Sequence, residues 1–148
     1  MNDVIAYEAL VERFGRLPTF HDAEVQAARL DSGQQTDGRA SLELDIHLFD
    51  ADGLLPDGQT NFTRHTLATL RFEGVEAVEL DGFGPQNVLW DLEIEDLGNG
   101  APDSARLRVS LPASNGLAGS FRCEQALVVA VRDFEPGTHS VYHRPQSR

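Results

Sequence analysis

The sequence predicts a mainly β domain of the α+β class, in which seven to eight antiparallel strands form a curved sheet or a sandwich with one N-terminal helix. Three observations support this fold class. Hydrophobic residues follow a period of about 3.6 only near the N-terminus, and they alternate with a period of two over much of residues 23–133. Turn-forming residues separate the alternating runs, with no helical segments between them of the kind that a parallel sheet requires.

The helix is expected at residues 3–15. Asp3 can cap its N-terminus, and hydrophobic side chains recur at three- and four-residue spacing up to Phe14. Gly15 is a suitable C-terminal stop, and Pro18 prevents the helix from resuming. We therefore expect about three helical turns that dock on the sheet by one apolar stripe.

The first three strands are expected at residues 23–31, 40–49 and 64–72. In the second of them, four aliphatic residues alternate with polar ones, which is typical of an antiparallel strand with one face buried. Residues 50–61 contain two glycines and a proline and are expected to form a long exposed loop.

Four further strands are expected at residues 75–80, 86–96, 105–111 and 119–132, of which the last is bent or split near Glu124. The strand at 86–96 would direct four large side chains to the core. They are Val88, Trp90, Leu92 and Ile94. Residues 134–148 are expected to form an irregular tail, so that residues 1–148 make a single domain.

The segment 81–87 is expected to form a tight corner, because two glycines and a proline surround Phe83. Phe83 is predicted to fill the core from this corner. Gln86 and Asn87 are predicted to bind loop backbone groups that have no strand partner.

Charge narrows the class of partner. The 148 residues carry a net charge of −12, and all twelve basic residues are arginines. Binding of DNA or of an anionic membrane requires positive charge, so this composition argues against both and favours a basic partner. The single cysteine, Cys123, cannot form an internal disulfide, and the N-terminus lacks a signal-peptide pattern, so a cytoplasmic protein is expected.

The acidic residues are concentrated in one region. From Glu73 to Asp96 there are eight acidic residues and no basic one. Such a patch increases the rate of association with a basic protein and helps to select it. The residues predicted to contact the partner are Glu73, Glu76, Glu79, Asp91, Glu93 and Glu95.

The segment 17–25 lies where the predicted helix ends and the first strand begins, and it combines Phe20, His21, Asp22 and Glu24. His21 is expected to bind backbone at this corner, and Asp22 to hold the turn. In another interpretation, His21, Asp22 and Glu24 ligate a metal ion of a small enzyme, and His47 or His65 completes the set. Because neighbouring residues on a strand point to opposite faces, we expect no metal and no other cofactor.

The run Leu17-Pro18-Thr19-Phe20-His21-Asp22-Ala23-Glu24-Val25 resembles the opening of the immunity protein 50 family of bacterial polymorphic toxin systems. Later segments are similar to motifs of that family and extend the resemblance over most of residues 10–95. They are Ile46-His47-Leu48-Phe49, Leu70-Arg71-Phe72, Gly82-Phe83 and Gln86-Asn87-Val88-Leu89.

The resemblance implies a cytoplasmic protein that binds and neutralises a cognate toxin without catalysis. Together with the charge, it leads to the hypothesis of an immunity protein that covers a basic toxin surface. Two other functions stay open at the level of the sequence: the small metal-dependent enzyme, and a regulatory or assembly module without a toxin.

Overall fold

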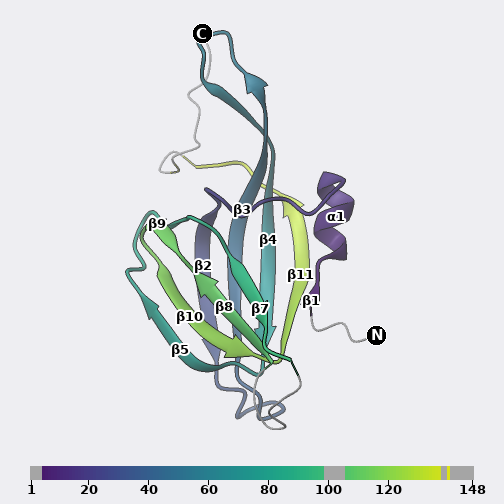
Figure 1. Cartoon of the computed structure of the whole chain (residues 1–148), viewed down its shortest axis with the longest axis vertical. Coiled ribbons are helices and arrows are strands. Elements are labelled where there is room, and N and C mark those ends of the chain that lie inside the picture. Colours follow the sequence, from purple (N-terminus) through teal and green to yellow (C-terminus); the bar gives the residue numbers. More distant parts are fainter. Residues whose placement is uncertain (1–4, 99–105, 138–139, 141–148) are drawn as a thin grey trace.

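The computed structural model describes residues 5–98, 106–137 and 140. Within these residues the chain forms two sheets that pack face to face, with one short helix at an edge (Figure 1). No helix in this part of the chain is long and apolar enough to cross a membrane. The predicted mainly β fold with one helix is therefore confirmed.

The described residues form eleven strands, more than the seven to eight expected. The seven-stranded sheet, called the large sheet, has the order β1 (Ile5–Ala6), β11 (Gln125–Asp133), β4 (Thr60–Glu73), β3 (Ser41–Leu54), β2 (Glu24–Asp31), β6 (Val88–Leu89) and β9 (Ala113–Asn115). The four-stranded sheet, called the small sheet, has the order β5 (Glu76–Asp81), β10 (Ala118–Cys123), β8 (Leu107–Leu111) and β7 (Glu93–Asp96). Neighbouring strands are antiparallel except β1 and β11, which are parallel.

The core lies between the sheets and follows the predicted alternation. In β3, Leu42, Leu44, Ile46 and Leu48 are all fully buried. Side chains of β8 and β10 face them from the small sheet, and Phe72 meets Phe121 across the interface with ring centroids 5.0 Å apart. Each fully buried aliphatic side chain contributes about 1.5–3 kcal/mol, so this alternation accounts for much of the attraction between the sheets.

The helix α1 (Glu8–Phe14) is shorter than predicted. Leu10 and Phe14 are buried, and α1 lies beside β11 (Figure 1). Gly15 ends the helix with φ at 79°, and its N–H donates to the Val11 carbonyl over 2.8 Å, as expected of a C-terminal glycine. The predicted start was wrong because residues 5–6 pair with β11 as a strand, and Asp3 lies outside the described residues.

The prediction of a long loop at residues 50–61 was also wrong. Here β3 continues to Leu54 and β4 begins at Thr60, so the two strands extend as a hairpin beyond the rest of the sheet (Figure 1). Register shifts near Asp50 and near Leu54 interrupt the pairing without ending it. Only a tight tip remains as loop, in which the Leu55 N–H donates to the Gln59 carbonyl.

The strand expected at 86–96 divides between the two sheets. Its first part is β6 in the large sheet and its second part is β7 in the small sheet. Trp90 lies at the crossing and is 59% exposed, so its predicted place in the core was wrong. The predicted split near Glu124 is confirmed, because β10 ends at Cys123 and β11 begins at Gln125. Of the predicted tail, residues 134–137 and 140 are described and contain no strand.

Candidate functional site

The corner at residues 20–23 divides into a buried pair and an exposed pair. Phe20 and Ala23 are buried, whereas the side chains of His21 and Asp22 are about half exposed. The Ala23 N–H donates to the Phe20 carbonyl, and the Asp22 N–H donates to the Leu89 carbonyl of β6. Asp22 has φ at 69°, a left-handed conformation that aspartate tolerates better than most residues. The buried residues and the backbone hydrogen bonds thus fix the corner, and the side chains of His21 and Asp22 are presented to solvent.

His21 packs against Trp90. The Nδ1 atom of His21 lies 2.7 Å from the Trp90 carbonyl oxygen, and the two rings are perpendicular with centroids 4.7 Å apart. The Trp90 N–H donates to the Pro112 carbonyl over 2.7 Å. The predicted backbone contact of His21 is therefore present, but its acceptor belongs to a segment almost seventy residues away and not to the corner itself.

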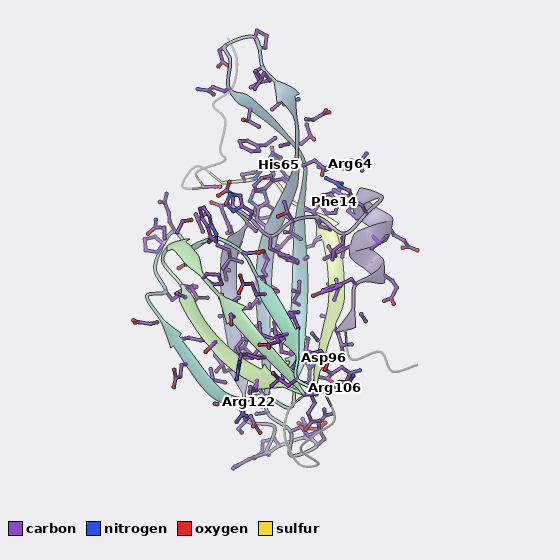
Figure 2. All side chains as sticks on the ribbon, in the orientation of Figure 1. Phe14, Arg64, His65, Asp96, Arg106 and Arg122 are labelled. Atoms are coloured by element: carbon purple, nitrogen blue, oxygen red, sulfur yellow. The ribbon has the colours of Figure 1, made fainter. Side chains whose placement is uncertain are left out.

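Glu24 lies on the other side of the corner in a buried chain of polar groups. Its Oε1 atom is 2.8 Å from Nδ1 of His47, and Nε2 of His47 is 2.8 Å from Nδ1 of His65. Ser140 donates its hydroxyl to the same Glu24 oxygen over 2.7 Å. Figure 2 shows His65 at the base of the protruding hairpin. Because an ionised carboxylate only accepts, Nδ1 of His47 donates to it and the imidazole orientation is fixed.

These positions bear on the metal-site interpretation. Glu24 and His47 are in direct contact, whereas His21 and Asp22 face solvent beside Trp90. His47 is fully buried. Among the described residues no group of three or more His, Cys, Asp or Glu side chains could hold a metal ion. The four candidate ligands thus belong to two separate clusters.

The segment 81–87 ties loops together, as predicted, through Asn87. Its side-chain oxygen accepts from the N–H groups of Gly84 and Leu117, and its side-chain nitrogen donates to the Gly84 carbonyl. Gly116 allows this close approach, because a Cβ atom there would overlap the Gln86 carbonyl and Asn87. The predicted burial of Phe83 was wrong, since it is 54% exposed.

Four of the residues singled out by the sequence border one cavity of about 470 Å³ beside β2. They are Glu24, Phe83, Gln86 and Asn87. Gly137 and Ser140 of the C-terminal segment border it as well. Glu24 directs its carboxylate into the polar chain with His47, so the cavity does not present an isolated buried charge.

The acidic residues predicted to contact a partner separate in the structure. Four of them lie on the outer face of the small sheet, defined as the face directed away from the core. Strand pairing arranges this face in two rows that cross β7, β8, β10 and β5 in that order. The first row is Glu93, Ser110, Ser120 and Glu79, and the second row is Glu95, Arg108, Arg122 and Glu76.

The two rows differ in charge. In the second row Arg122 contacts Glu76 at 2.9 Å and Arg108 contacts Glu95 at 3.4 Å, so the charges cancel. Figure 2 shows Arg122 near the lower end of the small sheet. In the first row two serines separate Glu79 and Glu93, which are exposed and have no ion-pair partner among the described residues.

The other two predicted contacts, Glu73 and Asp91, lie elsewhere. Glu73 ends β4 and accepts from Arg71 over 3.0 Å, with Arg39 at 3.8 Å. Asp91 follows Trp90 directly, and its carboxylate accepts from the Leu92 N–H over 2.8 Å. Asp91 therefore belongs to the Trp90 corner, and Glu73 belongs to the large sheet.

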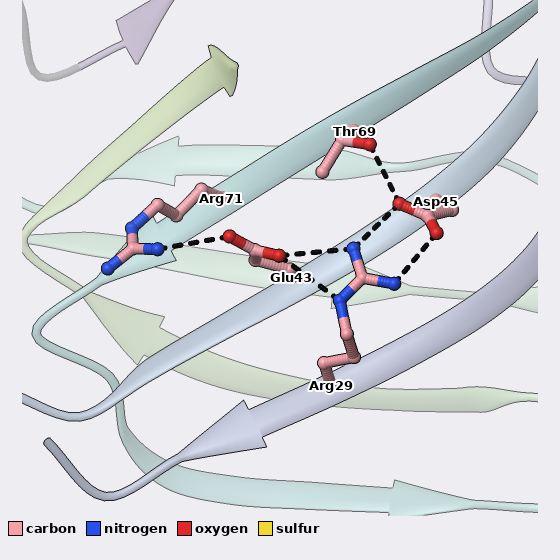
Figure 3. A network of polar contacts seen from close by, with 5 residues as sticks. All are labelled: Arg29, Glu43, Asp45, Thr69 and Arg71. Carbon is pink, nitrogen blue, oxygen red and sulfur yellow. Dashed lines mark hydrogen bonds and ion pairs between the residues drawn. The ribbon is translucent and has the colours of Figure 1, made fainter. Parts of the chain in front are cut away.

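The outer face of the large sheet carries a dense network of charges (Figure 3). Arg29 donates to Glu43 and to both oxygens of Asp45, and Arg71 donates to Glu43 from the other side. Thr69 donates to Asp45 over 2.7 Å. The guanidinium of Arg29 is the main cause that holds the pKa of Asp45 below its usual range, and the Thr69 hydroxyl adds to this effect.

Cys123, the single cysteine, is the last residue of β10 and is buried in the core between the sheets. Burial raises the pKa of its thiol to about 12. Because the thiolate is the nucleophile, a thiol with this pKa is inert at neutral pH.

Sequence reasoning missed the role of Trp90, and it named His65 only as an alternative to His47 in a metal site. The alternation around Trp90 resembled a continuous strand, although Asp91 directly after it is a turn-favouring residue that could have indicated the break. The role of His65 depends on pairing between β3 and β4 and gave no local signal.

A protein-family model described as Immunity protein 50 matches residues 7–134. The match therefore covers α1 and every strand of both sheets except β1, and it extends beyond the residues 10–95 that carried the resemblance. No curated protein and no solved structure matches the chain significantly.

Proposed function

The chain belongs to the immunity protein 50 family, and from this premise we propose that it binds a cognate bacterial toxin and neutralises it by covering the toxin surface. The observation that carries this proposal is the match over residues 7–134, which spans nearly the whole described fold. In this proposal the protein acts in the bacterial cytoplasm as a stoichiometric inhibitor and catalyses no reaction of its own.

The outer face of the small sheet is the proposed toxin-binding surface. It is built on four paired strands, so its side chains are held by a rigid framework, and its uncompensated charges are Glu79 and Glu93. Three strand intervals of about 4.8 Å separate these two positions, which places them about 14 Å apart. A basic toxin surface, such as that of a nuclease, would supply two cationic groups at this spacing.

The charge distribution suits a contact that directs association. Exposed charges at the rim of an interface change the association rate and the choice of partner more than they change the final affinity. The two serines between Glu79 and Glu93 are small and leave this part of the sheet flat. The net charge of −12 attracts a basic toxin over a longer range.

The experiment is co-expression with the C-terminal domain of the protein that the upstream neighbouring gene encodes. We expect that this domain alone stops growth, that co-expression restores growth, and that the two proteins copurify one to one. An immunity protein of an unrelated family serves as the control and should not protect. Growth arrest that persists in the presence of this chain, or protection without a complex, would contradict the proposal.

A further inference from the structure

Trp90 is the one tryptophan of the chain, and it is mostly exposed although hydrogen bonds hold its backbone on both sides. The backbone N–H of Trp90 donates to the Pro112 carbonyl, and the Trp90 carbonyl accepts from His21. The imidazole ring of His21 packs perpendicular to the indole ring of Trp90. Exposed tryptophans that are held in this way lose little conformational entropy on binding, and tryptophan is enriched among the residues that dominate interface affinity.

The hydrogen bond of His21 fixes the orientation of its ring. A carbonyl oxygen only accepts, so Nδ1 of His21 donates to the Trp90 carbonyl. Nε2 lies 3.5 Å from the carboxylate oxygen Oδ2 of Asp22, whose side chain is half exposed. An exposed carboxylate therefore lies beside the ring that packs against the indole, and a cationic group that also stacks on aromatic rings is the chemical complement.

We propose that Trp90, His21 and Asp22 form a receptor for an arginine side chain of a protein partner. The planar guanidinium stacks on the indole, and its N–H groups donate to the Asp22 carboxylate. A guanidinium carries five donors in a fixed plane and stacks on aromatic rings, whereas the ammonium of lysine is a compact, strongly hydrated point charge. The net charge of −12 favours the approach of a cationic partner.

In this proposal the residues of the corner motif have two separate roles. Phe20 and Ala23 anchor the corner in the core, and the two residues between them are presented to solvent. The backbone N–H of His21 also donates to the Thr19 hydroxyl over 3.1 Å, which helps to hold His21 and Asp22 in place.

The inference deepens the proposed function, because the arginine would belong to the toxin. Its test uses peptides in place of the toxin, so that the two proposals can fail separately. The probe is a glycine–arginine peptide with three arginines, and its counterparts contain lysine or citrulline at the same positions. The single indole N–H resonance of ¹⁵N-labelled protein reports binding at Trp90 alone.

At physiological ionic strength we expect the arginine peptide to shift the indole resonance to saturation, the lysine peptide to bind more weakly, and the uncharged citrulline peptide to cause no shift. Asp22→Asn should weaken arginine binding about threefold, as loss of one exposed ion pair does. Asp52→Asn is the matched control, because Asp52 is exposed on the protruding hairpin and its loss changes the net charge equally. This control should leave the affinity unchanged.

Three results would overturn the receptor: an indole resonance that does not move, a lysine peptide that binds as tightly as the arginine peptide, or equal weakening by Asp22→Asn and Asp52→Asn. The amide spectrum of each variant shows whether it is folded. The comparison of the three peptides on the unchanged protein decides the proposal without any variant.

Discussion

The outer faces of the two sheets both carry acidic and basic side chains, but they arrange them differently. On the large sheet one central strand, β3, presents Glu43 and Asp45 between an arginine of β2 and an arginine of β4, so each carboxylate has several donors (Figure 3). On the small sheet the two arginines lie on the central strands, directly opposite each other, and the acidic residues lie on the edge strands β5 and β7.

The difference shows how strand order assigns a role to a charge. A carboxylate between two cationic strands is held by several hydrogen bonds, and it is poorly available to a partner. A carboxylate on an edge strand has a neighbour on one side only, and its other side faces solvent. We therefore expect substitutions on the large sheet to change stability, and substitutions on the small sheet to change binding.

The largest effect is expected for Glu24→Ala at the buried end of the large sheet. The substitution removes the acceptor of His47 and of Ser140, and buried donors without acceptors cost about 1–3 kcal/mol each. The free energy of unfolding should fall by about 2–3 kcal/mol in urea titrations. Glu95→Ala on the small sheet is the control and should change it by less than about 0.5 kcal/mol. Equal losses would remove the contrast between the faces.

Arginine substitutions should separate the two faces by a smaller margin. Arg29→Ala removes four hydrogen bonds to two carboxylates, and because Arg29 is half exposed we expect a loss of about 1–2 kcal/mol in stability. Arg122→Ala removes one ion pair at 2.9 Å and should cost less than about 1 kcal/mol. Thermal unfolding of both variants would show the difference, and a larger loss for Arg122→Ala would contradict it.

Substitutions on the outer face of the small sheet should change the rate of association with the toxin. The double variant Glu79→Gln with Glu93→Gln should slow association with the toxin about five- to tenfold at low salt and leave stability unchanged, because these exposed charges act at a distance. The control with equal charge change is Glu12→Gln with Asp52→Asn, both at exposed positions away from the small sheet. Stopped-flow association rates measure the effect. Equal slowing by both double variants would show that net charge alone matters.

The smallest effect concerns the acid stability of the network. The folded-state pKa of Asp45 is lowered, so its contribution is present above the unfolded-state pKa of about 3.9 and is lost as pH falls through the folded-state pKa. Asp45→Asn should therefore flatten the decline of stability below about pH 4, by less than about 1 kcal/mol. Urea titrations at several pH values measure the decline. Parallel curves for the two proteins would indicate that Asp45 makes no such contribution.

The parts of the fold that depend on local pattern could be predicted from the sequence. The alternation from Leu42 to Leu48 gave the buried face of β3, and the polar residue Glu124 marked the division between β10 and β11. The N-terminal boundary of α1 could not be predicted, because pairing with a strand about 120 residues away decides it. The hairpin was missed because register shifts accommodate the glycines that would otherwise end a strand.

The candidate surfaces show the same limit. A period of two places Glu93 and Glu95 on one face, but their meeting with Glu76 and Glu79 requires the order of four strands. Trp90 was assigned to the core because Val88 and Leu92 flank it at strand spacing, and the chain changes sheets between them. The composition of the corner motif drew attention to His21 and Asp22, whereas the contact of His21 with Trp90 follows from tertiary structure alone.

The pairing of β1 and α1 with β11 has a consequence for the order of folding during synthesis. β1 and α1 complete their contacts only when β11 has been made, and the edge of β4 stays open until then. Protein synthesis proceeds at about 5–20 residues per second, so this edge is exposed for several seconds in every new chain. Nascent chains are open to mispairing at β4 until β11 pairs with it.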